Sequence, residues 1–213
     1  MGIHTIYPKP KLSQPGKEHK KFPYLLRNKA IKFPNQVWAI DITYIPMKTG
    51  HMYLTAIIDW HSRFIVGWSL SDTLDTAPVI EALTRALEQY GIPSIINSDQ
   101  GSQFTSDAYI GLLKANGIRQ SMDGKARWVD NVIIERWFRS LKTECVYIND
   151  YASPRELRAG IKAYIRAYNT SDLTRAGITK PRRRFTTHLS HNKRLHEYCR
   201  PYCIFFGSTK NCF

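Results

Sequence analysis

The sequence predicts an α/β fold in which a mixed sheet of five strands carries helices on both faces. Two observations support this fold class. Three β-branched and aromatic runs follow one another with only short connections, which is typical of antiparallel strands. Two further short apolar runs then alternate with stretches of helical periodicity, and that alternation indicates helices packed over a sheet.

The antiparallel part of the sheet comes first. Runs rich in β-branched and aromatic residues predict strands at Val37–Ile45, Met52–Trp60 and Phe64–Leu70. Only the turn-like segments Lys48-Thr49-Gly50 and His61-Ser62-Arg63 separate them. Connections this short join antiparallel neighbours, because a parallel pair needs a much longer crossover.

Helices and short strands alternate in the next part of the chain. A helix is expected over Thr76–Tyr90, where apolar residues recur at helical spacing, and it should end before Gly91. The elements expected after it are a buried strand from Ile95 that stops at Asp99, a helix at Ser106–Asn116 and a strand at Ile118–Ser121.

Two amphipathic helices complete the expected fold, one from about Val129 and the last at Pro154–Tyr168. At 100° per residue, the first of them brings four polar residues into an arc of about 80°. This polar stripe consists of Asn131, Glu135, Arg139 and Lys142. The neighbouring apolar arc consists of Ile134, Trp137, Phe138, Leu141 and Cys145. The apolar arc can therefore pack on the sheet while the polar border overhangs Asp41 and Asp99.

Three acids in this arrangement suggest a metal site. Asp41 stands inside an apolar strand, where an unpaired carboxylate is costly and no basic residue is near in sequence. Asp99 follows the fourth strand, and 35 residues separate it from Glu135. Hard divalent cations prefer oxygen ligands, and phosphoryl-transfer sites complete the metal's shell with substrate phosphates and water.

Two of these acids also have structural alternatives. Asp99 could form an Asx-turn before Gly101, a role that is compatible with metal binding. Glu135 could be a solvated helix acid that pairs with Arg139 at i,i+4.

Other residues are interpreted as structural. Asp59 ends a strand, and Asp130 is expected to cap the Glu135 helix. The side chains interpreted as core or loop anchors rather than as base-stacking platforms are Trp38, Trp60, Trp128 and Trp137.

The residues around the three acids resemble a known family. The motifs are Trp-Ala-Ile-Asp-Ile-Thr-Tyr-Ile at Asp41, Ser-Asp-Gln-Gly-Ser-Gln-Phe at Asp99 and Val-Ile-Ile-Glu-Arg-Trp-Phe-Arg-Ser-Leu-Lys at Glu135. Together with the last spacing, they resemble the catalytic triad of insertion-sequence transposases of the retroviral-integrase (DDE) type. The similarity covers residues from roughly 5 to 170, and the ordered set of motifs is far more specific than any one acid.

The resemblance implies a ribonuclease H-like fold and a metal-dependent reaction on DNA. Asp41 would lie on the first, central strand and Asp99 at the carboxyl end of the fourth. Two Mg²⁺ or Mn²⁺ ions, about 4 Å apart in such sites, would be bridged by Asp41 and held singly by Asp99 and Glu135. The expected activity is cleavage of a DNA strand followed by transfer of its 3′-hydroxyl to target DNA, without a covalent protein intermediate.

The resemblance also implies partners. The DNA would comprise transposon ends and target, bound by a homo-oligomer of the chain. Arg139 and Lys142 are expected to contact phosphates beside the metals. Gln100, Gln103 and Asn131 could position DNA or the third acid.

The formal net charge of +14 is concentrated at the two ends. Residues 1–36 carry eight Lys or Arg against one acid, residues 171–213 carry nine against two, and residues 37–170 carry fourteen of each. The sequence therefore divides into a basic Pro- and Lys-rich arm, a catalytic core and an atypical basic tail. The arm could be a contact to the DNA backbone or a solvated linker.

The ends also bear on how much of the family the chain contains. A helical DNA-binding region precedes the arm in the family, so the chain is expected to be a partial copy. No run of about 18 apolar residues and no signal peptide are recognised, so a cytoplasmic protein without a membrane span is expected.

The tail departs from the family after Tyr168-Asn169. The family continues there with Arg-Pro-His and later Thr-Pro-Ala-Glu, whereas this chain reads Thr170-Ser171-Asp172-Leu173. One permitted choice of codons gives both family motifs in a second reading frame. We therefore hypothesise that residues from about Ser171 onward are out of frame, which sequencing of the gene would test.

Two alternatives to the transposase function stay open. One is a related nuclease that cuts without joining, and the other is an inactive remnant that at most binds nucleic acid.

Overall fold

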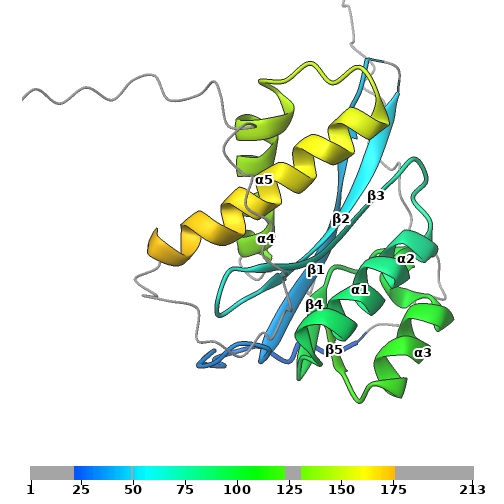
Figure 1. The fold of residues 1–213 in the computed structure, drawn as a ribbon. Helices are drawn as coiled ribbons and strands as arrows, with labels where there is room; N and C mark the ends of the chain where they lie inside the picture. Colours follow the sequence, from blue (N-terminus) through cyan, green and yellow to red (C-terminus); the bar gives the residue numbers. More distant parts are fainter. Residues whose placement is uncertain (1–21, 49, 123–130, 176–213) are drawn as a thin grey trace, which may run out of the picture. The chain divides into compact units, whose positions relative to one another are not determined.

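The computed structural model of the protein describes residues 22–48, 50–122 and 131–175, with side chains through residue 170. These residues form a five-stranded sheet in the order β3-β2-β1-β4-β5 (Figure 1). The strands are β1 (Val37–Pro46), β2 (His51–Asp59), β3 (Ile65–Ser71), β4 (Ile95–Ser98) and β5 (Arg119–Met122). The first three are antiparallel, whereas β4 is parallel to β1 and β5 is parallel to β4. The predicted mixed sheet is confirmed.

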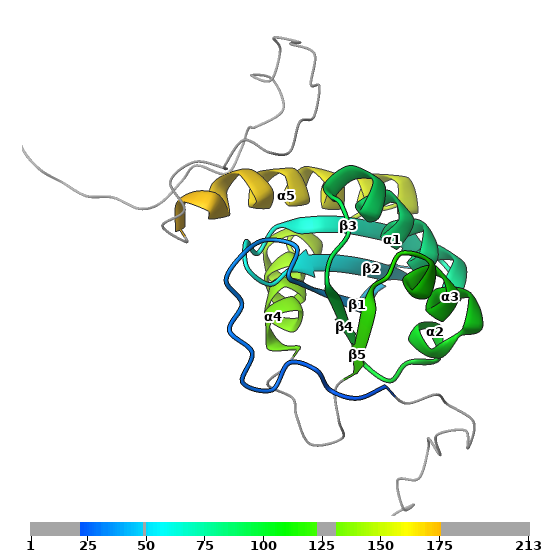
Figure 2. The same ribbon diagram turned by 90° about the horizontal axis from the view of Figure 1, so that it is seen from below.

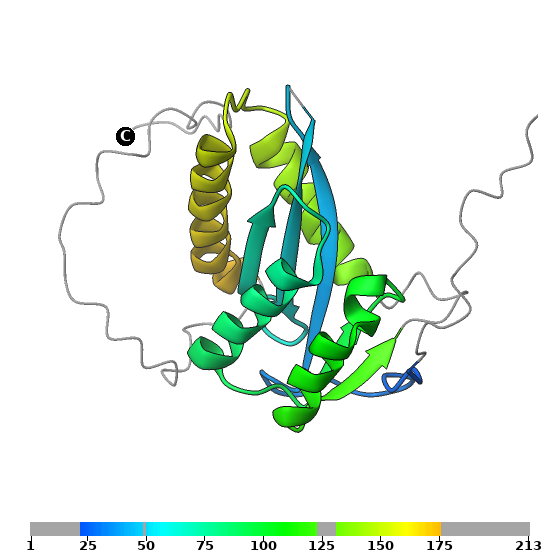
Figure 3. The same cartoon turned by 90° about the vertical axis from the view of Figure 1, so that its right-hand side faces the viewer.

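Helices cover both faces of the sheet, as predicted. They are α1 (Thr76–Tyr90), α2 (Ser102–Thr105), α3 (Asp107–Ala115), α4 (Val132–Leu141), the π-helical turn η1 (Lys142–Val146) and α5 (Pro154–Arg175). In Figures 1 and 3, α1, α2 and α3 lie on one side of the sheet and α4 and α5 on the other. Among the helices of the described ranges, none combines the length and the apolar character that crossing a membrane requires.

Strand alternation divides the buried residues into two cores. On β1, Trp38 and Ile40 point to the core under α1 and α3, and Ala39 and Ile45 point to the core under α4 and α5. All four side chains are completely buried. The central strand is thus fixed from both faces.

The strand β1 is longer than its parallel neighbour. Its pairing with β4 covers only Val37, Trp38 and Ala39, whereas its pairing with β2 continues to Pro46. Figure 2 shows β1 between these two strands. The second half of β1 therefore has a strand partner on one side only in the described part of the chain, and Asp41 lies just past the point where β4 stops pairing.

The segment before β1 is part of the folded core. Leu26 is buried and forms a small cluster with Val37 and Ile95. The backbone N–H of Leu25 donates to Ser121 Oγ on β5 at 3.1 Å. Residues 22–36, the second half of the expected basic arm, thus run against the edge of the sheet instead of forming a free linker.

Some element boundaries differ from the predictions. The helix α4 begins at Val132 rather than near Val129, and its N-cap position is held by Asn131 and not by Asp130. Asp130 and Trp128 lie outside the described residues. The short α2 and the turn η1 were not predicted. The last helix was expected to end at Tyr168, but α5 continues through Arg175, since no Pro or Gly interrupts it there.

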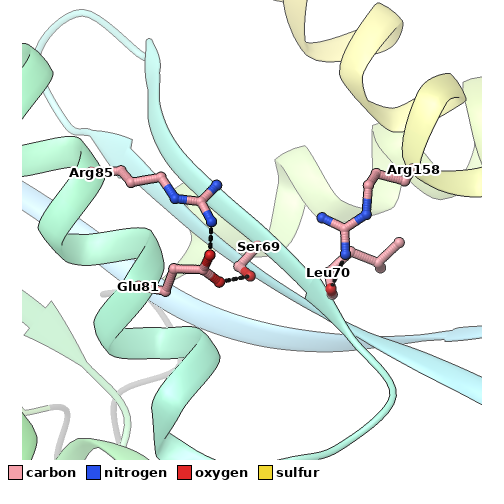
Figure 4. A network of polar contacts seen from close by, with 5 residues as sticks. All are labelled: Ser69, Leu70, Glu81, Arg85 and Arg158. Carbon is pink, nitrogen blue, oxygen red and sulfur yellow. Dashed lines mark hydrogen bonds and ion pairs between the residues drawn. The ribbon is translucent and has the colours of Figure 1, made fainter. Parts of the chain in front are cut away.

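The edge strand β3 is covered by side chains from helices on both faces (Figure 4). Ser69 Oγ donates to Glu81 Oε2 at 3.3 Å, and Glu81 forms an ion pair with Arg85 one turn further along α1. From α5, Arg158 Nη2 donates to the carbonyl oxygen of Leu70 at 2.5 Å. Such contacts occupy an edge that could otherwise pair with another strand.

A second contact from α5 imitates a strand partner. The Asn169 side chain accepts from the backbone N–H of Ile65 at 2.9 Å and donates to the carbonyl oxygen of the same residue at 3.1 Å. The position where the sequence leaves the family pattern is therefore preceded by a residue that anchors α5 to the sheet.

Replacing Gly67 by Val is expected to lower the free energy of unfolding by about 1–3 kcal/mol, because the site is overpacked by any side chain. A Cβ at Gly67 would lie 2.9 Å from both Ala82 O and Ala86 Cβ, so α1 crosses β3 too closely for one. Urea denaturation would measure the change. The matched control is Gly111→Ala on α3, where a Cβ meets nothing within 4 Å and stability should stay equal or rise.

Candidate active site

Two of the three predicted acids line one pocket. Asp41 from β1 and Glu135 from the first turn of α4 both line a pocket of about 310 Å³. The pocket is also lined by Ile42, Thr43, Phe138, Arg139, Lys142, Thr143 and Tyr147. Asp41 is half-buried, and its Oδ1 accepts a hydrogen bond from the backbone N–H of Ile42 at 2.8 Å.

Three of the four residues of the predicted polar stripe of α4 line this pocket, and the fourth, Asn131, is buried at the start of the helix. Glu135, Arg139 and Lys142 all line it, while Ile134, Trp137, Phe138, Leu141 and Cys145 are buried against the sheet. Glu135 and Arg139 are exposed, and no ion pair joins them within the described residues. The surface pair between these two residues, which was the structural alternative, is therefore absent, and both charged groups are open to a solute.

Lys142 is the least exposed cation of the pocket. Burial lowers the pKa of its ammonium group below the usual value for lysine. Its Nζ lies 4.9 Å from the centroid of the Tyr44 ring, a cation–π contact. A cation that protein has partly stripped of water gains more from a phosphate group than a fully solvated one does.

Asp99 follows β4, and its side chain is hydrogen-bonded to the backbone of the loop in which it lies. The parallel register pairs Ala39 with Asn97, so continuing it by two residues would place Asp99 level with Asp41. The strand stops at Ser98, however, and Asp99 Oδ1 accepts a hydrogen bond from the backbone N–H of Gly101 at 2.9 Å. The Asx-turn predicted as an alternative is present, and Asp99 does not line the pocket.

The structure does not gather the three acids around one point. Among the described residues, no three side chains of Asp, Glu, His or Cys are close enough together to hold one metal ion. The donor chemistry of the pocket still suits such an ion, because two carboxylates from separate elements present hard oxygen ligands to a space that also admits solvent. The role of Asp99 as a third ligand stays a prediction.

The other predicted DNA-contact residues do not line the pocket. Gln103 lies in α2 and donates from Nε2 to the carbonyl oxygen of Leu74 at 2.8 Å, a contact that holds α2 against the segment before α1. Asn131 is only 6% exposed at the N-cap of α4, and its Oδ1 has no hydrogen-bond partner in the described ranges. Their contacts to DNA, and those of Gln100, stay predictions.

The residues interpreted as structural have structural surroundings. Asp59 is 1% exposed and accepts hydrogen bonds from the backbone N–H of Asn35 and from both the N–H and the hydroxyl of Ser62. Trp38 is completely buried, and its Nε1 donates to Asn35 Oδ1 at 3.1 Å. Trp137 is 2% exposed in the core under α4. None of these three is placed to meet a DNA substrate.

The sequence analysis missed three residues of the pocket that a substrate would meet. Thr43, Thr143 and Tyr147 line it, and Tyr147 is 61% exposed. Thr43 could have been found, because it stands two residues after Asp41 and strand alternation puts both on one face. Thr143 could also have been found, because it stands four residues after Arg139, and its Oγ1 donates to the carbonyl oxygen of Arg139 at 3.0 Å. Tyr147 could not, because the π-helical turn changes the angular spacing between Lys142 and Tyr147.

Comparison with protein families gives two matches to the integrase core domain. One match covers residues 32–127 and the other residues 116–172, so together they contain the sheet, the helices up to the last residues of α5 and all three predicted acids. The second match ends at residue 172, close to Ser171, from which a change of reading frame is hypothesised.

Curated relatives include insertion-sequence transposases. The chain is 38% identical over 134 residues to the transposase InsF for insertion sequence IS3A of Escherichia coli, covering 62% of this chain and 46% of that protein. It is 35% identical over 147 residues to the transposase for insertion sequence element IS904 of Lactococcus lactis, covering 68% of this chain and 58% of that protein. The chain thus spans about half the length of these relatives.

A solved structure supports the fold. The intasome of simian T-cell lymphotropic virus, in complex with PP2A regulatory subunit B56 gamma, aligns with a TM-score of 0.51 and 23% identity over 60% of this chain and 45% of that one. At this sequence identity, the comparison supports a shared fold and nothing further. With this architecture, the two family matches and the sequence identities above, the chain belongs to the integrase core domain family and has its ribonuclease H-like fold.

Proposed function

We propose that the chain is the catalytic core of a DDE transposase that cuts and joins DNA strands with the help of divalent metal ions. The observation that carries this proposal is the pocket in which Asp41 and Glu135 lie beside Arg139 and Lys142. Carboxylates can hold the metal and the cations can hold phosphate, which are the two requirements of phosphoryl transfer in such enzymes. We also propose a cytoplasmic location.

Asp41 and Glu135 would hold the metal, with Asp99 as the proposed third ligand. The proposed metal is Mg²⁺ or Mn²⁺, as two ions, which when bound would activate water or a 3′-hydroxyl and stabilise charge on the reacting phosphate. Arg139 and Lys142 would bind the phosphate oxygens and keep the strand in register. No side chain of the pocket is proposed to form a covalent bond to DNA.

A strand-transfer assay tests the function. The unchanged chain is incubated with DNA ends and target DNA in Mg²⁺, in Mn²⁺ and in a chelator. Metal-dependent joined products are expected. Cleavage without joining would instead identify a nuclease. DNA binding that survives Asp41→Asn, without any metal-dependent cleavage by the unchanged chain, would identify an inactive remnant.

Two wider parts of the proposal concern assembly and the ends of the chain. We propose that copies of the chain assemble on DNA, which the mass of the protein–DNA complex would measure. The division into an arm of residues 1–36, a core of residues 37–170 and a tail of residues 171–213 is part of the same proposal, with residues 22–36 of the arm packed against the core.

Replacing Lys142 by Ala is expected to weaken DNA binding about three- to tenfold and to reduce the dependence of binding on salt. One lost phosphate contact lowers the slope of log Kobs against log salt concentration by about one. Fluorescence anisotropy over a series of salt concentrations measures both quantities. The matched control is Lys114→Ala, since Lys114 lies in the last turn of α3 and does not line the pocket. Equal slopes for the two variants would contradict the assignment.

A further inference from the structure

Two exposed tyrosines border the pocket. Tyr44 is 62% exposed and Tyr147 is 61% exposed, although most other large apolar side chains of the described residues are buried. Tyr147 lines the pocket itself, and Tyr44 lies under Lys142, which also lines it. One solvent-exposed aromatic ring therefore lies at the pocket itself, and a second lies against the lysine that lines it.

The π-helical turn explains how Tyr147 reaches this position. Its backbone N–H donates to the carbonyl oxygen of Lys142 at 2.8 Å, a bond that spans five residues instead of the four of an α-helix. Residues bonded in this way lie one turn apart on the same side of the helix. In a continued α-helix that place would fall to Val146, which is instead buried in the core under α4. The turn thus presents an aromatic ring where an aliphatic side chain would otherwise stand.

The second tyrosine is held by a cation. Lys142 Nζ lies over the ring of Tyr44, so one face of that ring is turned to the ammonium group that lines the pocket. The arrangement joins an aromatic surface to a phosphate-binding charge. Proteins that bind single-stranded nucleic acid combine the same two elements, with rings stacking on bases and cations following the backbone.

An unpaired nucleobase is the occupant that fits best. Inside duplex DNA both faces of each base are covered by its neighbours, and a blunt end exposes only the outer face of its terminal pair, whereas an unpaired base can offer both faces to protein rings. We propose that Tyr44 and Tyr147 stack against an unpaired base of the strand that reacts at Asp41 and Glu135, and so give the site a preference for DNA ends with single-stranded nucleotides. This inference rests on the proposed function, because the reacting strand supplies the base.

Fluorescent DNA tests the stacking directly. The probe is a duplex with a short 3′ overhang that carries 2-aminopurine, compared with the blunt duplex and with the same overhang containing an abasic nucleotide. Binding is measured by anisotropy without added metal, and stacking by quenching of the 2-aminopurine. The unchanged chain is expected to bind the overhang about tenfold more tightly than the blunt duplex and to quench the fluorophore.

The variants separate ring stacking from general apolar contact. Tyr44→Leu and Tyr147→Leu should each reduce the preference for the overhang several-fold and reduce the quenching, whereas Tyr44→Phe and Tyr147→Phe should keep both. The matched control is Phe33→Leu, because Phe33 is 55% exposed but does not line the pocket. Arg139→Ala should weaken blunt and overhang DNA alike and leave their ratio unchanged, because Arg139 lines the pocket but is not the cation that lies over Tyr44.

Two results would overturn the inference. One is equal binding of the abasic and the intact overhang by the unchanged chain, and the other is full preference and quenching in both Leu variants. Thermal melting of each variant shows that it is folded, which the exposure of both rings leads us to expect. Metal-dependent strand joining is scored separately: its absence from the unchanged chain refutes the proposed function, while intact joining without any effect of the rings refutes only the stacking.

Discussion

Replacing Asp41 by Asn is expected to reduce metal-dependent strand cleavage by at least about 10³-fold, which corresponds to about 4 kcal/mol of transition-state stabilisation. The amide keeps the shape of the carboxylate and can still accept the hydrogen bond from Ile42, so the fold should be unchanged. The loss arises because a neutral amide is a poor ligand for a hard cation. Initial rates on end-labelled DNA in Mg²⁺ measure the effect.

The control for this variant is Asp75→Asn. Asp75 is an exposed acid before α1 whose side chain makes no capping hydrogen bond, so its replacement should leave cleavage within about twofold. Cleavage by Asp41→Asn within tenfold of the unchanged chain would remove Asp41 from the proposed metal site. Asp99 does not line the pocket, so its role as a third metal ligand needs its own test. Cleavage by Asp99→Asn, compared with cleavage by Asp75→Asn in the same way, decides whether Asp99 takes part in the reaction.

Replacing Asp59 by Ala is expected to lower the free energy of unfolding by about 3 kcal/mol. Its carboxylate accepts three hydrogen bonds, at 3.0 Å from Asn35 N, 2.8 Å from Ser62 N and 2.6 Å from Ser62 Oγ, and it is only 1% exposed. Truncation leaves donors without a partner, and each such loss costs about 1–3 kcal/mol. Urea denaturation measures the change.

The matched control for Asp59→Ala is Asp72→Ala, an exposed acid for which the change should stay within about 0.5 kcal/mol. Asp59→Asn should fall between, since one amide oxygen can replace only part of the acceptor set. A loss below 1 kcal/mol in Asp59→Ala would mean that the network around Asn35 and Ser62 finds other partners. The losses in free energy of unfolding for Asp59→Ala and Asp72→Ala would then be more similar than the burial of Asp59 and the exposure of Asp72 lead us to expect.

Asp41 and Asp59 mark what the sequence could and could not predict about the site. Both are acids in apolar strands, and their residue surroundings alone do not separate a metal ligand from a buried hydrogen-bond acceptor. Asp41 was predicted to be the metal ligand because of the motifs that resemble the transposase family and the 35 residues between Asp99 and Glu135. The contacts of Asp59 agree with its structural interpretation, while metal binding by the three acids stays a prediction.

The strands and α1 were predictable because their patterns are local. The bounds of α1 agree with those expected from helical spacing, and each predicted strand lies within about one residue of the observed one. The single turn α2 has too few residues for any period. Its place depends on distant contacts, such as the hydrogen bond from Gln120 Nε2 to the carbonyl oxygen of Phe104 at 2.7 Å.

The two tyrosines that border the pocket could not be predicted from the sequence, because their positions depend on non-local contacts and on an irregular helical turn. Tyr44 stands three residues after Asp41, so strand alternation assigns it to the opposite face, and only the length of the Lys142 side chain links it to the pocket. Tyr147 depends on η1, whose hydrogen-bond pattern has no sequence period of its own. The reading-frame hypothesis for residues after about Ser171 also stays a prediction, because the codons of the gene and not the fold of the chain test it.

The brevity of β4 has a consequence for access to DNA. This strand contributes only four residues, and its ladder with β1 ends at Ala39, two positions before the proposed catalytic aspartate. Two or three more β-forming residues would let the ladder advance beyond Asp41 and put a wall of backbone beside it. Insertions after Ser98 are therefore expected to close the approach to the carboxylate while leaving the hydrophobic layers intact, so the early end of one short strand leaves Asp41 accessible to the proposed DNA substrate.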